Sequence, residues 1–100
     1  MKRVMVTYKV KNNRVQENEE LVRAVYQELN QNQDPDVHYV TFKLDDGQTF
    51  VHMAAFASEE KQSILTGSDS FKAFQKGLMD RCEVPPNPQN LHEIGSHNFV

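Results

Sequence analysis

The first residues of the chain alternate between apolar and polar side chains with a period of two. The more apolar side of residues 3 to 10 consists of Val4, Val6, Tyr8 and Val10. The other side consists of Arg3, Met5, Thr7 and Lys9. This period predicts a β-strand over residues 3 to 10 with one side well buried.

A helical period replaces this alternation after residue 13. Apolar residues recur at helical spacings at Val15, Val22, Val25 and Leu29. Asn12 and Asn13 are suitable caps for a first turn, and acidic residues follow where a helix N-terminus favours them. We expect a helix from about residue 14 to residue 31, ending before Asp34-Pro35-Asp36.

Two apolar segments, 37 to 44 and 48 to 56, flank the sequence Asp45-Asp46-Gly47. A glycine after an aspartate supplies the positive φ of a tight hairpin, and a two-residue loop makes Asp45 face Gln48. Both faces of this hairpin are then apolar; a three-residue loop with a bulge would shift the pairings. One face holds His38, Val40, Phe42, Leu44, Val51, Met53 and Ala55. The other holds Val37, Tyr39, Thr41, Phe50, His52, Ala54 and Phe56.

The C-terminal half predicts one more helix and one more strand. A single helical turn is expected at residues 58 to 62, and Ser68 or Ser70 can cap the helix that follows. That helix has one apolar stripe made of Phe71, Phe74, Leu78 and Cys82. The prolines of residues 83 to 88 predict a crossover loop, and the last strand is expected from about residue 91 to residue 99.

The order βαββαβ predicts a single α+β domain over residues 1–100, with the ferredoxin-like, antiparallel four-stranded sheet. Two helices can cover only one face of such a sheet. Because the hairpin is apolar on both faces, we expect a second chain to cover the other face.

Composition narrows the choice of partners and location. The chain has 11 basic and 14 acidic residues, a formal charge of −3, and its basic residues are scattered. Nucleic acids and anionic membranes are therefore poor partners. No run approaches the roughly 20 apolar residues that span a bilayer. Cys82 is the only cysteine and no signal peptide is evident, so we expect a soluble protein of the cytoplasm.

The sequence also resembles a known group of proteins. The segments MKRVMVTYKVKNNRVQENEELVRAVYQEL, TFKLDDGQTFVHMAAF and SFKAFQKGLMDRC are similar to the antibiotic-biosynthesis-monooxygenase-like families of dimeric α+β barrels. The resemblance implies that two sheets pack face to face across a twofold axis, with a small-molecule cavity between each sheet and its helices. It places Val40, Phe42, Val51 and Met53 in the homodimer interface.

This chain departs from those families at several positions. Phe56 occupies the strand end where many members have tryptophan, and Phe71 or Phe74 lies where several have a helical histidine. The chain has no tryptophan, and residues 1 to 11 contain no asparagine. Haem breakdown, which in the family uses an asparagine, a tryptophan and a histidine, is therefore disfavoured.

His52 is the most suggestive candidate for chemistry, because a histidine facing an enclosed space can transfer a proton or orient a hydroxyl. The hydroxyls of Tyr39 and Tyr8 are candidates to orient a phenolic substrate or to stabilise its enolate or phenolate; the alternative is that both tyrosines are packing residues with one solvated end. For His52 the alternative is a buried structural histidine bonded to Thr41 or Tyr39. The candidate ligand-binding residues are Thr41, Phe50, Phe56 and Phe74.

No metal or cofactor is expected. The spacings of His38, His52, His92 and His97 match no known ligand set, and there is no phosphate-binding glycine loop. The resemblance implies a cofactor-independent monooxygenase that acts on a small aromatic or polyketide-like molecule. The rival hypothesis is a dimeric binding or stress-associated protein that holds a metabolite in the same cavity without transforming it.

Overall fold

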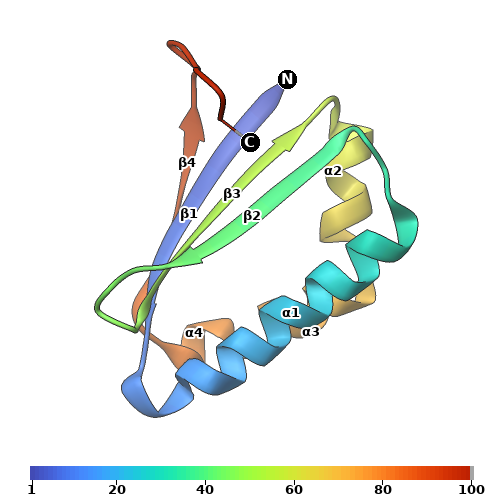
Figure 1. The fold of residues 1–100 in the computed structure, drawn as a ribbon. Coiled ribbons are helices and arrows are strands. Elements are labelled where there is room, and N and C mark those ends of the chain that lie inside the picture. The colour runs from blue at the N-terminus through green and yellow to red at the C-terminus, as the bar shows by residue number, and fades with distance from the viewer. Residues whose placement is uncertain (100) are drawn as a thin grey trace.

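The structure is a computed structural model that describes residues 1–99, and its strands form one antiparallel sheet in the order β2-β3-β1-β4 (Figure 1). The strands are β1 (Lys2–Val10), β2 (Val37–Lys43), β3 (Thr49–Phe56) and β4 (Cys82–Leu91). The helices are η1 (Asn12–Arg14), α1 (Val15–Asn32), α2 (Glu59–Thr66), α3 (Asp69–Gln75) and α4 (Leu78–Arg81). The main helices lie on one face of the sheet, which confirms the ferredoxin-like α+β prediction.

The central hairpin has the predicted register. Val37 pairs with Phe56 and Lys43 pairs with Phe50, and the Leu44 N–H donates to the Thr49 carbonyl at 2.8 Å. Gly47 has φ +72° and donates its N–H to the carbonyl of Leu44 at 3.0 Å. This bond centres the turn on Asp45 and Asp46, so the predicted two-residue loop of Asp46 and Gly47 does not form, although the strand register is the predicted one.

The helices cover one face of the hairpin and leave the other exposed to solvent. Phe50 and Phe56 are buried under the helices and belong to the hydrophobic core. On the opposite face Val40, Phe42 and Leu44 are 39%, 48% and 47% exposed. The predicted two-sided apolar hairpin is thus present, and one side of it is open in the single chain.

The second apolar stripe does not form one helix. The chain breaks after Gln75, where Lys76 has extended dihedral angles and Gly77 has φ +77°. Glycine adopts this left-handed conformation without strain, so it redirects the chain into the short helix α4. Ser68 is the cap of α3, accepting a hydrogen bond from the Phe71 N–H at 3.3 Å.

The prediction of the last strand was wrong. The expected crossover loop, residues 83 to 88, is part of strand β4, and residues 92 to 99 form no regular strand. Proline lacks a backbone N–H but is tolerated on an edge strand, where one side of the backbone needs no partner. β4 pairs only with β1, through register shifts that accommodate Pro85 and Pro86.

Two smaller expectations at helix starts also differ. Neither Asn12 nor Asn13 caps α1; both lie in the 3₁₀ turn η1, and α1 begins without a side-chain cap. The expected single turn at 58 to 62 is the longer helix α2, capped by Ser58. Among residues 1–99, no helix combines the length and apolar character that crossing a bilayer requires.

Candidate functional site

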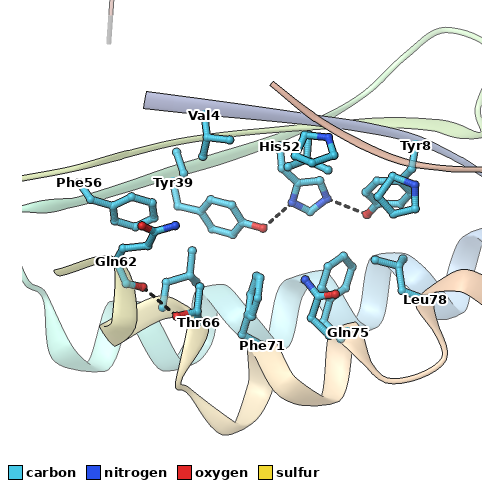
Figure 2. Close-up of a pocket in the computed structure, with 16 residues that line it drawn as sticks. Val4, Tyr8, Tyr39, His52, Phe56, Gln62, Thr66, Phe71, Gln75 and Leu78 are labelled. Atoms are coloured by element: carbon cyan, nitrogen blue, oxygen red, sulfur yellow. Dashed lines mark hydrogen bonds between the residues drawn. The ribbon is translucent and has the colours of Figure 1, made fainter. Parts of the chain in front are cut away.

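A cavity of about 250 Å³ lies between the covered face of the sheet and helices α2 and α3 (Figure 2). The sheet contributes Val4, Val6, Tyr8, Tyr39, His52, Ala54 and Phe56 to its wall. The helical side contributes Gln62, Leu65, Thr66, Phe71, Phe74, Gln75 and Leu78, and β4 adds Pro86 and Pro88. An apolar cavity of roughly 150 Å³ can hold benzene, so this one has room for a molecule of one or two rings.

His52 lies in the middle of the sheet wall between two tyrosine hydroxyls (Figure 2). Its Nε2 atom is 2.6 Å from the Tyr8 hydroxyl, and its Nδ1 atom is hydrogen-bonded to the Tyr39 hydroxyl. Thr41 Oγ1 is 3.2 Å from the same Nδ1 atom. Both ring nitrogens therefore have partners within the protein.

These contacts follow from the strand register. His52 pairs with Val6 of β1 on one side and with Thr41 of β2 on the other. Tyr8 and Tyr39 are each two residues away from those pairs, so all three side chains emerge on the covered face of the sheet. The alternation seen in the sequence thus brings residues from three strands to one point.

A buried polar chain continues from Tyr8 into the helices. Asn18 Nδ2 donates to the Tyr8 hydroxyl at 3.0 Å, and Arg81 Nε donates to Asn18 Oδ1 at 3.2 Å. The Arg81 guanidinium also donates to the carbonyls of Phe74, at 2.7 Å, and Lys76, at 3.1 Å. Those carbonyls lie at the C-terminal end of α3, where a cation is favoured.

The Arg81 side chain is an unusual core residue, since it is only 1% exposed. Its guanidinium also lies 5.5 Å from the centre of the Phe74 ring. No carboxylate of the described residues is within ion-pair distance of it. Burial lowers the pKa of Arg81, yet arginine stays charged, so the interior beside the cavity is positive.

Burial controls the protonation of the central residues. It lowers the pKa of His52 to about 4, because the ring is packed among Tyr8, Tyr39 and Phe74 and loses its hydration. Burial also raises the pKa of Tyr8 and Tyr39 well above that of a free tyrosine. At neutral pH the imidazole and both phenols are therefore uncharged.

The structure brings together five of the seven candidate residues. Tyr8, Tyr39, His52, Phe56 and Phe74 all line the cavity. The remaining two lie behind its wall.

Thr41 and Phe50 do not line the cavity. Thr41 lies between His52 and the Tyr26 hydroxyl, which is 2.7 Å from Thr41 Oγ1. Phe50 is 2% exposed and stacks on the far side of Tyr8, with ring centres 5.6 Å apart. Direct ligand contact by these two residues would therefore require the wall to move.

Sequence reasoning missed the polar chain that supports the tyrosines. Asn18 falls within the buried helical stripe, three residues after Val15 and four before Val22. Arg81 follows Leu78 by three residues on the second stripe. A polar residue at an apolar position of a stripe is the signal that could have identified both.

The described residues contain no group of three or more histidine, cysteine, aspartate or glutamate side chains that could hold a metal ion. His38 is exposed and belongs to the open face of the sheet, whereas His92 and His97 follow β4. Of these four histidines, all within residues 1–99, His52 alone lines the cavity.

No family model and no curated protein matches this chain. Solved structures do match over nearly its whole length. A crystal structure of an antibiotic biosynthesis monooxygenase superposes with a TM-score of 0.78 at 13% identity, covering 95% of this chain and 100% of the other. A candidate antibiotic biosynthesis monooxygenase from Caulobacter crescentus has a TM-score of 0.77 at 19% identity, covering 94% and 90%.

A protein from Mycobacterium tuberculosis also superposes, with a TM-score of 0.77 at 12% identity, covering 95% of this chain and 96% of its own. At such low identities these matches establish the fold alone. The chain has the ferredoxin-like α+β fold of antibiotic biosynthesis monooxygenases. The resemblance noted in the sequence is thus confirmed at the level of fold.

Proposed function

We propose that the chain is a cofactor-independent monooxygenase that oxidises a small aromatic or polyketide-like molecule in this cavity. One observation carries the proposal. The wall of the cavity is mostly apolar, and His52 with its two tyrosine hydroxyls is the main polar feature of its sheet side. An apolar pocket with a few convergent polar groups is the usual form of a small-molecule site.

The chemistry we propose uses molecular oxygen as the only oxidant. An electron-rich phenol gives its hydroxyl proton to solvent and binds as the phenolate, which transfers an electron to O₂; the proton is taken up again when water forms. One oxygen atom then forms a bond to a ring carbon, and the other leaves as water with the two hydrogens that the substrate loses. The product is a quinone, so one phenol and one O₂ give one quinone and one water.

The residues of the wall have distinct roles in this proposal. Tyr39 donates a hydrogen bond to the phenolate oxygen, and His52 orients Tyr39 rather than acting as the base. Its low pKa and its two occupied nitrogens support orientation over proton abstraction. Phe56 and Phe74 form apolar walls that keep water from the anion.

We also propose that the protein is a homodimer through the open face of the sheet. Val40, Phe42, Val51 and Met53 lie on that face, and two of them are well exposed in the single chain. A second copy is the partner that the fold resemblance implies. Its sheet would cover these residues face to face.

Oxygen uptake with a panel of one- and two-ring phenols tests the enzyme proposal. Wild type should consume O₂ faster than buffer, and Tyr39→Phe should lower kcat/KM by about 10- to 100-fold, the usual effect of losing one hydrogen bond to a charged group. Ser63→Ala, which removes an exposed hydroxyl of α2 outside the cavity, is the control and should retain wild-type activity. Phenols that bind one per chain without oxygen uptake would instead support the non-catalytic binding protein.

A further inference from the structure

We propose that the buried pair Arg81 and Asn18 sets the direction of the whole hydrogen-bond chain, and thereby makes the Tyr39 hydroxyl a donor to a ligand oxygen. Arg81 and Asn18 are in this sense positioning residues, since neither lines the cavity. The inference rests on the proposed function only for the place of the ligand. The direction of the hydrogen bonds is a property of the free protein.

Arg81 fixes the donor and acceptor of the first hydrogen bond in this series. A guanidinium has five N–H donors and no acceptor, so Arg81 Nε can only donate to Asn18, at 3.2 Å. The atom of Asn18 that faces Arg81 must therefore be its oxygen. The amide nitrogen of Asn18 then faces Tyr8 and donates to its hydroxyl at 3.0 Å. Arginine thus removes the ambiguity of the amide orientation.

The next step is the single proton of the Tyr8 hydroxyl. Tyr8 is 1% exposed, so that proton needs an acceptor within the protein. Among the described residues its remaining partner is His52 Nε2, at 2.6 Å. If Nε2 carried a proton as well, two hydrogens would meet in this short contact. His52 Nε2 is therefore the acceptor.

The tautomer of His52 follows directly. A neutral imidazole with an unprotonated Nε2 carries its proton on Nδ1. The low pKa of His52, about 4, agrees with a neutral ring at physiological pH. The Nδ1–H group points at the hydroxyl of Tyr39, with Thr41 Oγ1 at 3.2 Å as a second acceptor.

Tyr39 is the last residue of this hydrogen-bond chain. Because its oxygen accepts from Nδ1, its own proton is free to be donated elsewhere. Thr41 Oγ1 is the competing acceptor inside the wall, but it is shared with Tyr26 at 2.7 Å and with His52 Nδ1 at 3.2 Å. Tyr39 lines the cavity, so the favoured acceptor is an oxygen atom of the ligand. The site should prefer a ring compound that carries a ketone or phenolate oxygen.

The substitution Asn18→Asp is designed to reverse this direction. An aspartate accepts from Arg81 and also accepts from Tyr8, so the Tyr8 proton turns away from the histidine. His52 Nε2 must then be the protonated nitrogen, and Nδ1 accepts from Tyr39. Asn13→Asp makes the same chemical change at an exposed position and is the matched control.

Nitrogen-15 NMR of the imidazole in ligand-free protein measures the tautomer. Wild type and Asn13→Asp should show a protonated Nδ1 and an unprotonated Nε2, and Asn18→Asp should show the reverse. An Nε2–H tautomer in wild type would overturn the proposal even if the variant fails to fold. An unchanged tautomer in folded Asn18→Asp would also overturn it.

Binding of two matched bicyclic probes tests the ligand preference. 1-Tetralone has one ketone oxygen, which can only accept, and tetralin has the same shape without it. Wild type should bind tetralone about tenfold more tightly than tetralin, and Asn18→Asp should lose this preference. An equal preference in both proteins would overturn the assignment of Tyr39. Because the tautomer needs no ligand and oxygen uptake is measured separately, failure of the enzyme proposal is distinguishable from failure of this one.

Discussion

The two faces of the hairpin β2–β3 are built from alternate residues of the same strands, yet they have opposite properties. On the covered face, Tyr39 and His52 are polar groups whose hydrogen bonds are made inside an apolar layer. On the open face, Val40 and Phe42 are apolar groups that remain 39% and 48% exposed. Covered polar groups suit a ligand site, whereas exposed apolar groups suit association.

The comparison shows that burial and polarity are set independently on the two faces. A strand places successive side chains on opposite faces, so each face can follow its own requirement. The helices supply the desolvation that lowers the pKa of His52. A second copy of the chain would supply the missing cover for the other face.

The largest expected effect comes from charging the open face. Val40→Glu with Phe42→Glu should convert the proposed dimer to monomer and raise its dissociation constant at least about a thousandfold, because each lost apolar contact occurs twice in a symmetric dimer. Sedimentation velocity over a range of concentrations measures this. Gln27→Glu, at an exposed position of α1, is the control and should stay dimeric. A wild-type protein that is monomeric at about 100 μM would contradict the proposal.

A smaller effect is expected on the covered face from Arg81→Met. This change leaves the carbonyls of Phe74 and Lys76 and the amide of Asn18 without their donor. The free energy of unfolding should fall by about 3 kcal/mol, as when one partner of a buried polar group is removed. Urea unfolding measures it, and Arg14→Met, at a surface ion pair, should leave the midpoint close to wild type. Equal midpoints for the two variants would show that the buried hydrogen bonds of Arg81 add little to the free energy of unfolding.

The last effect, which is no larger than that of Arg81→Met, concerns pH and His52. Its pKa is about 4 in the folded protein and about 6.5 when unfolded, so the unfolded state binds more protons between these values. The contribution of the neutral His52 ring to the free energy of unfolding should be fully present above pH 6.5. It should be lost as the pH falls toward 4, by on the order of 3 kcal/mol in total. The measurement is the urea midpoint of wild type and His52→Gln at pH 7.5 and pH 4.5. Parallel declines in both proteins would assign the acid sensitivity to other groups.

The strand register was predictable because it depends on local chemistry. The sequence Asp45-Asp46-Gly47 specifies a tight turn, and the period of two then assigns every hairpin residue to a face. This alone places Tyr39 and His52 on the same face of the hairpin, whereas the family resemblance implied that the helices cover that face. The position of Tyr8 beside them follows from the predicted topology, in which the first strand lies next to the third.

The C-terminal region was less predictable because its signals depend on neighbours. Pro85, Pro86 and Pro88 are typical of a loop, but they are accepted in β4 because this strand lies at an edge. The second apolar stripe predicted one helix, and Gly77 divides it because its left-handed conformation turns the chain. The first outcome depends on which strand is terminal in the sheet, and the second depends on the backbone conformation of Gly77, which a helical period does not reveal.

The sequence by itself determined the order of elements, the two apolar faces and the central histidine, because each depends on periods and turn residues that act over a few positions. Only the tertiary structure decided that Arg81 and Asn18 reach Tyr8. Asn18 lies 10 positions after Tyr8 in the sequence, and Arg81 lies 63 positions after Asn18. These contacts exist because a buried donor must find an acceptor wherever the packed chain provides one, and no local pattern specifies that acceptor.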